Sequence, residues 1–186
     1  EYTLVEVRKQ AAIRTQRADA ALVECDARAV LQANAVTAYR AALKVYTRAD
    51  HPVDWAMTQN NLAVALRNQA ARVEGDAGAA LLAEAVTAYR AVMEVRTRAD
   101  HPVDWATTQN NLGAVYQSLP TGDRGENLQQ AIECYTAALR VSTEADFPQE
   151  WAETTANIAL VEWTAANEWQ PEWVRYGWEL ETLWKH

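Results

Sequence analysis

A near-identical internal repeat constrains this chain more than any other feature of its sequence. The segment 35–62 reappears as 85–112, displaced by 50 residues, and only five of its 28 positions differ between the copies. A fixed period of this length is typical of arrays in which one supersecondary unit is copied and stacked. The sequence therefore predicts a repeat architecture and disfavours an enzyme with two independently shaped lobes.

Fainter copies of the same unit flank the central pair. Residues 25–27 align with 75–77, and residues 147–151 restate 101–105 with a displacement of 46. We therefore predict one domain over residues 1–186 that contains about four units. These cover approximately residues 1–50, 51–100, 101–146 and 147–168, followed by a tryptophan-rich capping helix over 171–185.

Apolar residues recur at helical spacing within each unit. Trp55, Thr58, Leu62 and Leu66 follow one another at steps of three and four, and a second helical pattern runs from 82 to 93. Sustained alternation, which would indicate strands, is absent. The glycine-rich segments 75–78 and 120–125 separate the patterns and are expected to be loops. The chain is thus predicted to be all-α.

Prolines mark where the units begin. Pro52, Pro102 and Pro148 suit the first turn of a helix, where the missing N–H has no intrahelical partner. Acidic residues follow two positions later and favour the positive end of the helix dipole. Two helices per unit cannot bury both apolar faces alone, so successive hairpins must stack into an α-solenoid with a concave side.

Composition excludes several classes of partner. The net charge of −8 and the pI near 4.9 argue against a nucleic-acid binder and against an anionic membrane surface. Cys25 and Cys134 form no metal or disulfide framework, which favours a reducing compartment. No apolar run reaches bilayer length and the start is not signal-like, so a cytoplasmic protein is expected.

The repeated residues resemble the tetratricopeptide repeat family. Leu112-Gly113-x-x-Tyr116 matches its first helix, and Ala131, Tyr135 and Ala138 match its second. Periods of 46 to 50 residues are similar to the long variety in kinesin light chains and in bacterial proteins that also carry CHAT protease domains. The resemblance implies a right-handed superhelix of helical hairpins whose concave groove binds peptide or protein segments.

Asparagines recur where members of that family hold a peptide. Asn61, Asn111 and Asn157 each precede the Leu or Ile of a first helix, and an amide offers both a donor and an acceptor to a peptide bond. The alternative is that these amides bond neighbouring helices and fix the stack. The same two roles apply to the adjacent or aligned amides, which are Asn60, Asn110 and Gln10.

Basic residues gather near the first unit of an otherwise acidic chain. Arg14 aligns with Val64 and Arg17 with Arg67, and the family resemblance places these positions on the concave face. Arg14, Arg17 and Arg67 would give the groove a positive end that favours an acidic side chain or a C-terminal carboxylate. A solvated charged helix surface is the alternative.

The tryptophans fall into two groups. Trp55, Trp105 and Trp151 recur at one place in three units and are expected to pack between hairpins. The others crowd the C-terminal quarter, where they either cap the last unit or form a docking face for a following domain or a second subunit. This second group is Trp163, Trp169, Trp173, Trp178 and Trp184.

Catalysis finds little support in the sequence. His51 and His101 occupy identical junctions and are expected to be structural, and no protease, esterase or metal-ligand motif is present. We therefore predict a non-enzymatic scaffold without cofactor or metal that binds a protein segment. The alternative is a regulatory region of a larger signalling or CHAT-protease protein.

Overall fold

A computed structural model of the chain describes residues 30–168, and every regular element in that range is an α-helix. The predicted all-α class is therefore confirmed for this part of the chain. None of its helices has both the length and the apolar character needed to cross a membrane. After a helical stretch over residues 30–42 come α2 (Pro52–Ala70), α3 (Gly75–Met93), α4 (Pro102–Ser118), α5 (Arg124–Leu139) and α6 (Pro148–Glu168).

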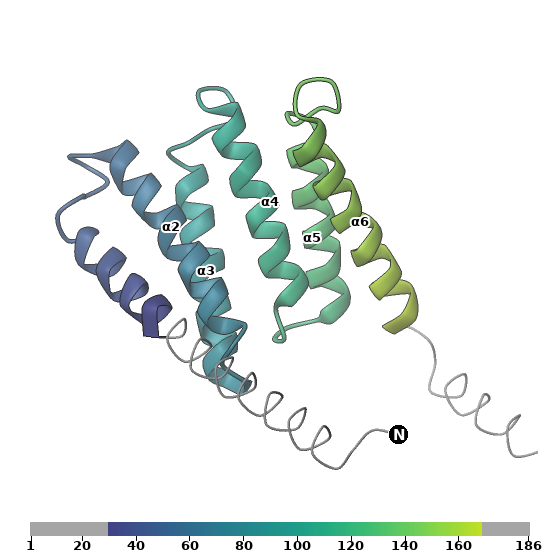
Figure 1. Ribbon diagram of the computed structural model, residues 1–186, viewed down its shortest axis with the longest axis horizontal. Coiled ribbons are helices and arrows are strands. Elements are labelled where there is room, and N and C mark those ends of the chain that lie inside the picture. Colours follow the sequence, from purple (N-terminus) through teal and green to yellow (C-terminus); the bar gives the residue numbers. More distant parts are fainter. Residues whose placement is uncertain (1–29, 169–186) are drawn as a thin grey trace, which may run out of the picture.

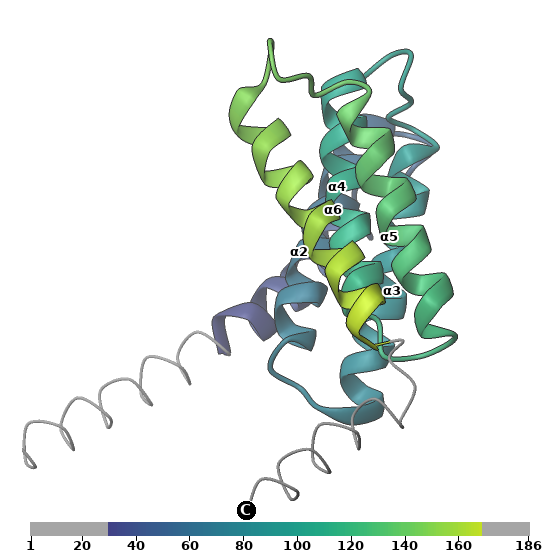
Figure 2. The same ribbon diagram turned by 90° about the vertical axis from the view of Figure 1, so that its right-hand side faces the viewer.

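The helices lie in two layers. In Figure 1, α2, α4 and α6 stand side by side, with α3 and α5 behind them, and the turned view in Figure 2 shows the same separation. Successive helices run in opposite directions, so α2 pairs with α3 and α4 with α5 as hairpins. The division into four units that wind as a superhelix stays a prediction, because the first helix of unit one and the C-terminal cap lie outside the described residues.

The prolines begin helices as predicted. Pro52, Pro102 and Pro148 are the first residues of α2, α4 and α6. The carbonyl of His51 accepts a hydrogen bond from the amide of Trp55 at 2.8 Å, and the pattern recurs at His101. Ahead of each start, a threonine hydroxyl bonds an aspartate carboxylate three residues on, at 2.6 to 2.8 Å. These turns fix the direction in which the chain enters each new hairpin.

Both expected loops are shorter than predicted. Of the segment 120–125, the last two residues, Arg124 and Gly125, already belong to α5. The segment 75–78 is the first turn of α3, and the connection from α2 is only residues 71–74. Gly75 has φ of +68°, which favours glycine at the turn. A Cβ on Gly78 would lie 2.2 Å from the carbonyl oxygen of Val73. Glycine at position 78 is therefore needed for the start of α3 to lie this close to Val73 in the preceding turn.

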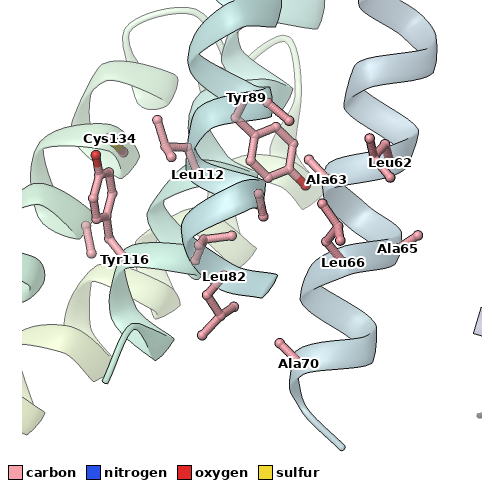
Figure 3. Close-up of a cluster of buried hydrophobic side chains, with 14 of the residues drawn as sticks. Leu62, Ala63, Ala65, Leu66, Ala70, Leu82, Tyr89, Leu112, Tyr116 and Cys134 are labelled. Atoms are coloured by element: carbon pink, nitrogen blue, oxygen red, sulfur yellow. The ribbon is translucent and has the colours of Figure 1, made fainter. Parts of the chain in front are cut away.

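A tyrosine lies between the two helices of each hairpin. In Figure 3, Tyr89 reaches from α3 toward Ala63 and Leu66 of α2, and the tyrosine is fully buried. Its counterpart Tyr135 in α5 lies against Gly113 of α4, where an added Cβ would sit 2.8 Å from the ring. The small residues at 63 and 113 thus set how closely the paired helices approach.

One apolar core runs through the hairpins. It joins Leu66 and Leu82 of the first hairpin to Leu112 and Val115 of α4, and it continues to Val161 of α6. Polar contacts add to this stacking between layers and hairpins. The guanidinium of Arg90 in α3 donates to the hydroxyl of Tyr116 in α4 at 2.5 Å and lies over its ring.

We expect Gly113→Ala to lower the free energy of unfolding by about 1–3 kcal/mol, because the new methyl group overpacks the Tyr135 ring. Ala63→Gly is the matched control, since it removes a methyl group at the same place in the preceding hairpin. Urea unfolding followed by circular dichroism measures both. Equal stability of Gly113→Ala and the wild type would show that the ring moves freely at this contact.

Candidate functional site

A cavity of about 710 Å³ opens beside α2, α4 and α6, and we call it the amide cavity. Asparagines from all three of these helices line it, together with Arg67 of α2, because the repeat places the same helix face in each unit toward the same side. The predicted site residues that it brings together are Arg67 of α2, Asn110 and Asn111 of α4, and Asn157 of α6.

The amides in this cavity are not equivalent. The side-chain oxygen of Asn110 accepts a hydrogen bond from the hydroxyl of Thr154 in α6 at 3.2 Å. Asn110 therefore links neighbouring hairpins, which is the structural role considered for these amides. Asn111 and Asn157 are half-buried, and neither side chain has a hydrogen-bond partner within residues 30–168. These two amides are free to bind a ligand.

A second cavity, of about 280 Å³, lies between α2 and the helical residues 30–42, and we call it the apolar cavity. Leu31, Tyr39 and Val64 supply much of its lining, and Asn61 borders it. Asn68 lines both cavities, so they adjoin along one face of α2. Asn61 thus belongs to the same surface as Asn111 without sharing its cavity.

The remaining predicted site residues are not part of either cavity. Asn60 is half-buried on α2 and lines neither of them. Gln10, Arg14 and Arg17 lie outside the described residues. The predicted positive end of the groove is therefore represented in the structure by Arg67 alone.

The two arginines that line the amide cavity differ in their hydrogen bonding. Arg124, at the start of α5, donates to the backbone carbonyl of Gln117 at 2.6 Å. Arg67 is half-buried, and among the described residues no hydrogen-bond acceptor or carboxylate partner is found for it. A guanidinium in this state can bind an anionic group without first giving up an internal partner.

The two core tyrosines differ in their hydrogen bonding. The Tyr135 hydroxyl donates to the side-chain oxygen of Gln117 at 3.1 Å, whereas the buried Tyr89 hydroxyl has no partner within residues 30–168. Burial raises the pKa of each phenol to about 12, and the Arg67 guanidinium offsets part of that rise at both. Arg67 therefore lies within electrostatic reach of both rings.

Other candidate residues show packing roles. Arg48 and Arg98 lie over the rings of Trp55 and Trp105, at 5.6 and 5.8 Å from the ring centres, so these half-buried tryptophans contact the turn that precedes their own helix. Their packing between hairpins stays a prediction. On α6, by contrast, Trp163 is 65% exposed. The other tryptophans of the C-terminal group lie outside the described residues.

The described part of the chain offers neither a metal-binding cluster nor an ionised thiol. No three His, Cys, Asp or Glu side chains lie close enough together there to hold a metal ion. Burial, with a smaller contribution from Glu133, raises the pKa of the Cys134 thiol to about 11, so this cysteine is a protonated core residue at neutral pH. The Tyr46 ring lies edge-on to His51, which places that histidine in a packing contact.

Sequence reasoning did not identify four residues of the amide cavity. Asn68 had an available signal, since it lies seven residues after Asn61 and therefore on the same face of α2. Gln117 also had one, since it holds the place of Arg67 in the next unit, 50 residues later. Arg124 had none, because its place depends on how α5 returns beside α4. Tyr135 was recognised only as part of the core motif, although it also lines this cavity.

Between pH about 10 and about 12, the free energy of unfolding should fall as the pH rises. Tyr89 and Tyr135 hold their protons to a pKa of about 12 in the folded chain, against 10.0 when unfolded. In this window the unfolded chain binds fewer protons, so each tyrosine lowers the stability by about 1.4 kcal/mol per pH unit. Urea unfolding across this range measures the slope.

Tyr89→Phe and Tyr135→Phe are the matched variants for this measurement. Each variant removes one titrating phenol. The slope of the unfolding free energy against pH should therefore become shallower by about 1.4 kcal/mol per pH unit. A slope that is identical in the wild type and both variants would contradict the assignment of these two groups.

Three comparisons bear on the identity of the chain. No protein-family model matches it, and neither a curated protein nor a solved structure does. What distinguishes the site is its geometry: two adjoining cavities, lined by Asn61, Asn68, Asn111, Asn157 and Arg67, whose side chains have no hydrogen-bond partner among residues 30–168.

Proposed function

We propose that this chain is a tetratricopeptide-like α-solenoid that binds an extended peptide or protein segment in the amide cavity and performs no chemistry. The observation that carries the proposal is the pair of unpaired amides, Asn111 and Asn157, in one cavity of about 710 Å³. They come from successive helices of the same layer. Each can donate to a carbonyl and accept from an N–H of a passing main chain.

The extension of the surface over three helices supports a segment over a small metabolite. The amide cavity adjoins the apolar cavity at Asn68, so the combined surface runs along α2 and crosses to α4 and α6. A main chain lying across this surface would meet Asn61, Asn111 and Asn157 in turn. The repeat places these amides at regular intervals. A peptide main chain likewise presents its N–H and C=O groups at regular intervals.

A second role is that of a regulatory region within a larger signalling or CHAT-protease protein. The observation that favours it is the end of α6, where Leu160 is 50% exposed and Trp163 is 65% exposed. Exposed apolar side chains of this size favour contact with further protein. In this role the solenoid senses its ligand and restrains an adjoining effector domain.

We expect Asn111→Ala with Asn157→Ala to weaken peptide binding about 10-fold to 30-fold, since each variant removes hydrogen bonds worth about 1 kcal/mol. Pull-down from native cell extract with mass spectrometry identifies candidate segments, and titration of synthetic copies measures the affinity. Gln149→Ala is the matched control, because it removes an exposed amide of α6 that bonds only Glu153.

Asn110→Ala separates the two roles of the amides. It removes the bond to Thr154 and should lower stability more than it lowers affinity. Undiminished binding by the folded double variant would exclude the amide cavity and direct attention to the exposed end of α6.

A further inference from the structure

Two ion pairs join the second helix of unit one to the second helix of unit two. Arg40 of the helical residues 30–42 contacts Glu84 of α3 at 2.6 Å. In the turn that follows that helix, Arg48 contacts Glu94, the C-cap residue of α3, at 2.7 Å. Because the units are near copies, the corresponding positions at the next junction, between α3 and α5, can be compared one by one.

The first ion pair is lost at the junction between α3 and α5. Arg90 of α3 holds the place of Arg40, 50 residues later. Opposite it, Gln130 of α5 holds the place of Glu84, 46 residues later. Arg90 donates instead to the hydroxyl of Tyr116 in α4, at 2.5 Å. Its guanidinium forms no ion pair with a carboxylate of the described residues.

The second ion pair is replaced by two like charges. Arg98 lies over the ring of Trp105, just as Arg48 lies over the tryptophan of its own junction. The place of Glu94 is taken by Arg140, since each of the two is the C-cap residue of its helix. Arg98 and Arg140 are both exposed, and neither forms an ion pair within residues 30–168.

These arginines border an open seam between α3 and α5, which lie behind α4 in Figure 1. Among the described residues, no Cα atom of α3 lies within 8 Å of one in α5. A cavity of about 480 Å³ occupies one end of the seam, where Arg90, Tyr116 and the first two turns of α5 line it. We call the surface formed by Arg90, Arg98, Gln130 and Arg140 the arginine seam.

We propose that the arginine seam binds an acidic segment of a partner protein, whose carboxylates replace the two that this junction lacks. One carboxylate meets Arg90 beside Gln130, and the other lies between Arg98 and Arg140. Guanidinium groups bind carboxylates through paired hydrogen bonds, and a carboxylate between two guanidiniums also offsets their mutual repulsion. The seam belongs to α3 and α5, so this inference does not rest on the amide cavity of α2, α4 and α6.

Two carboxylates of α5 limit where the segment can bind. Glu133 accepts hydrogen bonds from the amides of Gln129 and Gln130, at 3.2 and 3.1 Å, which hold it on its own helix. Glu126 lines the cavity at the first turn of α5. The acidic segment should therefore avoid the Glu126 end of the cavity and follow the seam from Arg90 toward the end of α5.

The helix geometry sets the spacing of the acidic residues in the segment. Gln130 and Arg140 are ten residues apart, so the two carboxylate positions lie about 15 Å apart along α5. An extended chain advances about 3.3 Å per residue, so acidic residues about four or five positions apart reach both positions.

The binding experiment uses synthetic peptides of neutral polar residues that carry two glutamates at stepwise increasing separations. Fluorescence anisotropy at low ionic strength should show the tightest binding when the glutamates are about four or five positions apart. Gln130→Glu with Arg140→Glu should weaken that binding about 10-fold, because the chain then supplies both carboxylates itself. This variant should unfold at or above the wild-type temperature, since both new carboxylates face arginines, so its loss of binding is not a loss of folding.

Lys44→Glu is the matched control for Arg140→Glu. Lys44 is exposed and holds the same place in unit one, so its reversal changes the net charge equally but outside the seam. Lys44→Glu should bind the peptides as the wild type does. Glu126→Gln should bind them about 2-fold to 5-fold more tightly, because it removes a carboxylate from the cavity wall.

Three results would overturn the proposal. Equal weakening by Lys44→Glu and Arg140→Glu, or an affinity independent of the glutamate separation, would show diffuse charge attraction without a site. Vesicles that contain an anionic phospholipid serve as the second probe. If the wild type binds these vesicles and none of the peptides, and Arg140→Glu abolishes that binding, the seam contacts a membrane surface and the assignment to an acidic protein segment is wrong.

Discussion

The rest of the described structure depends on how closely the two helices of a hairpin approach each other. A tyrosine from the second helix lies on the smallest residue of the first, Tyr89 on Ala63 and Tyr135 on Gly113. This contact fixes the separation within each hairpin, and the shared apolar core then fixes the separation between hairpins. With both distances set, one face of α2, α4 and α6 is turned toward the same side, and their amides line adjoining cavities.

Much of this fold could be predicted from the sequence because its determinants are local. Helical spacing and the prolines at 52, 102 and 148 gave the helix starts, and the repeat gave the equivalence of the hairpins. The segment 75–78 was mispredicted although its determinant is also local. Glycine normally indicates a chain break, but here Gly78 admits the carbonyl of Val73, a contact that exists only once the turn has formed.

The sequence could predict the part of the candidate site that the repeat generates. Asn111 and Asn157 lie in one cavity because they hold the same position in successive units. The role of Asn110 was not predictable, since its partner Thr154 lies 44 residues away in the next hairpin. The same limit applies to Arg67. Its counterpart Gln117 accepts the hydroxyl proton of Tyr135, whereas the Tyr89 hydroxyl has no partner among the described residues. This difference between the two hairpins is visible only in the folded structure.

The tight contact at Gly113 also bears on how a chain with duplicated segments reaches one folded state. The first 11 residues of α2 and α4 differ only at Met57 and Thr107, so early in folding α5 can meet either helix. Paired with α2, Tyr135 would meet Ala63 in place of Gly113 and Arg67 in place of Gln117, so its hydroxyl would lose the acceptor that it has in α4. The few differences between the copies, among them Gly113 and Gln117 of α4, thus favour the pairing of α5 with α4 over its pairing with α2.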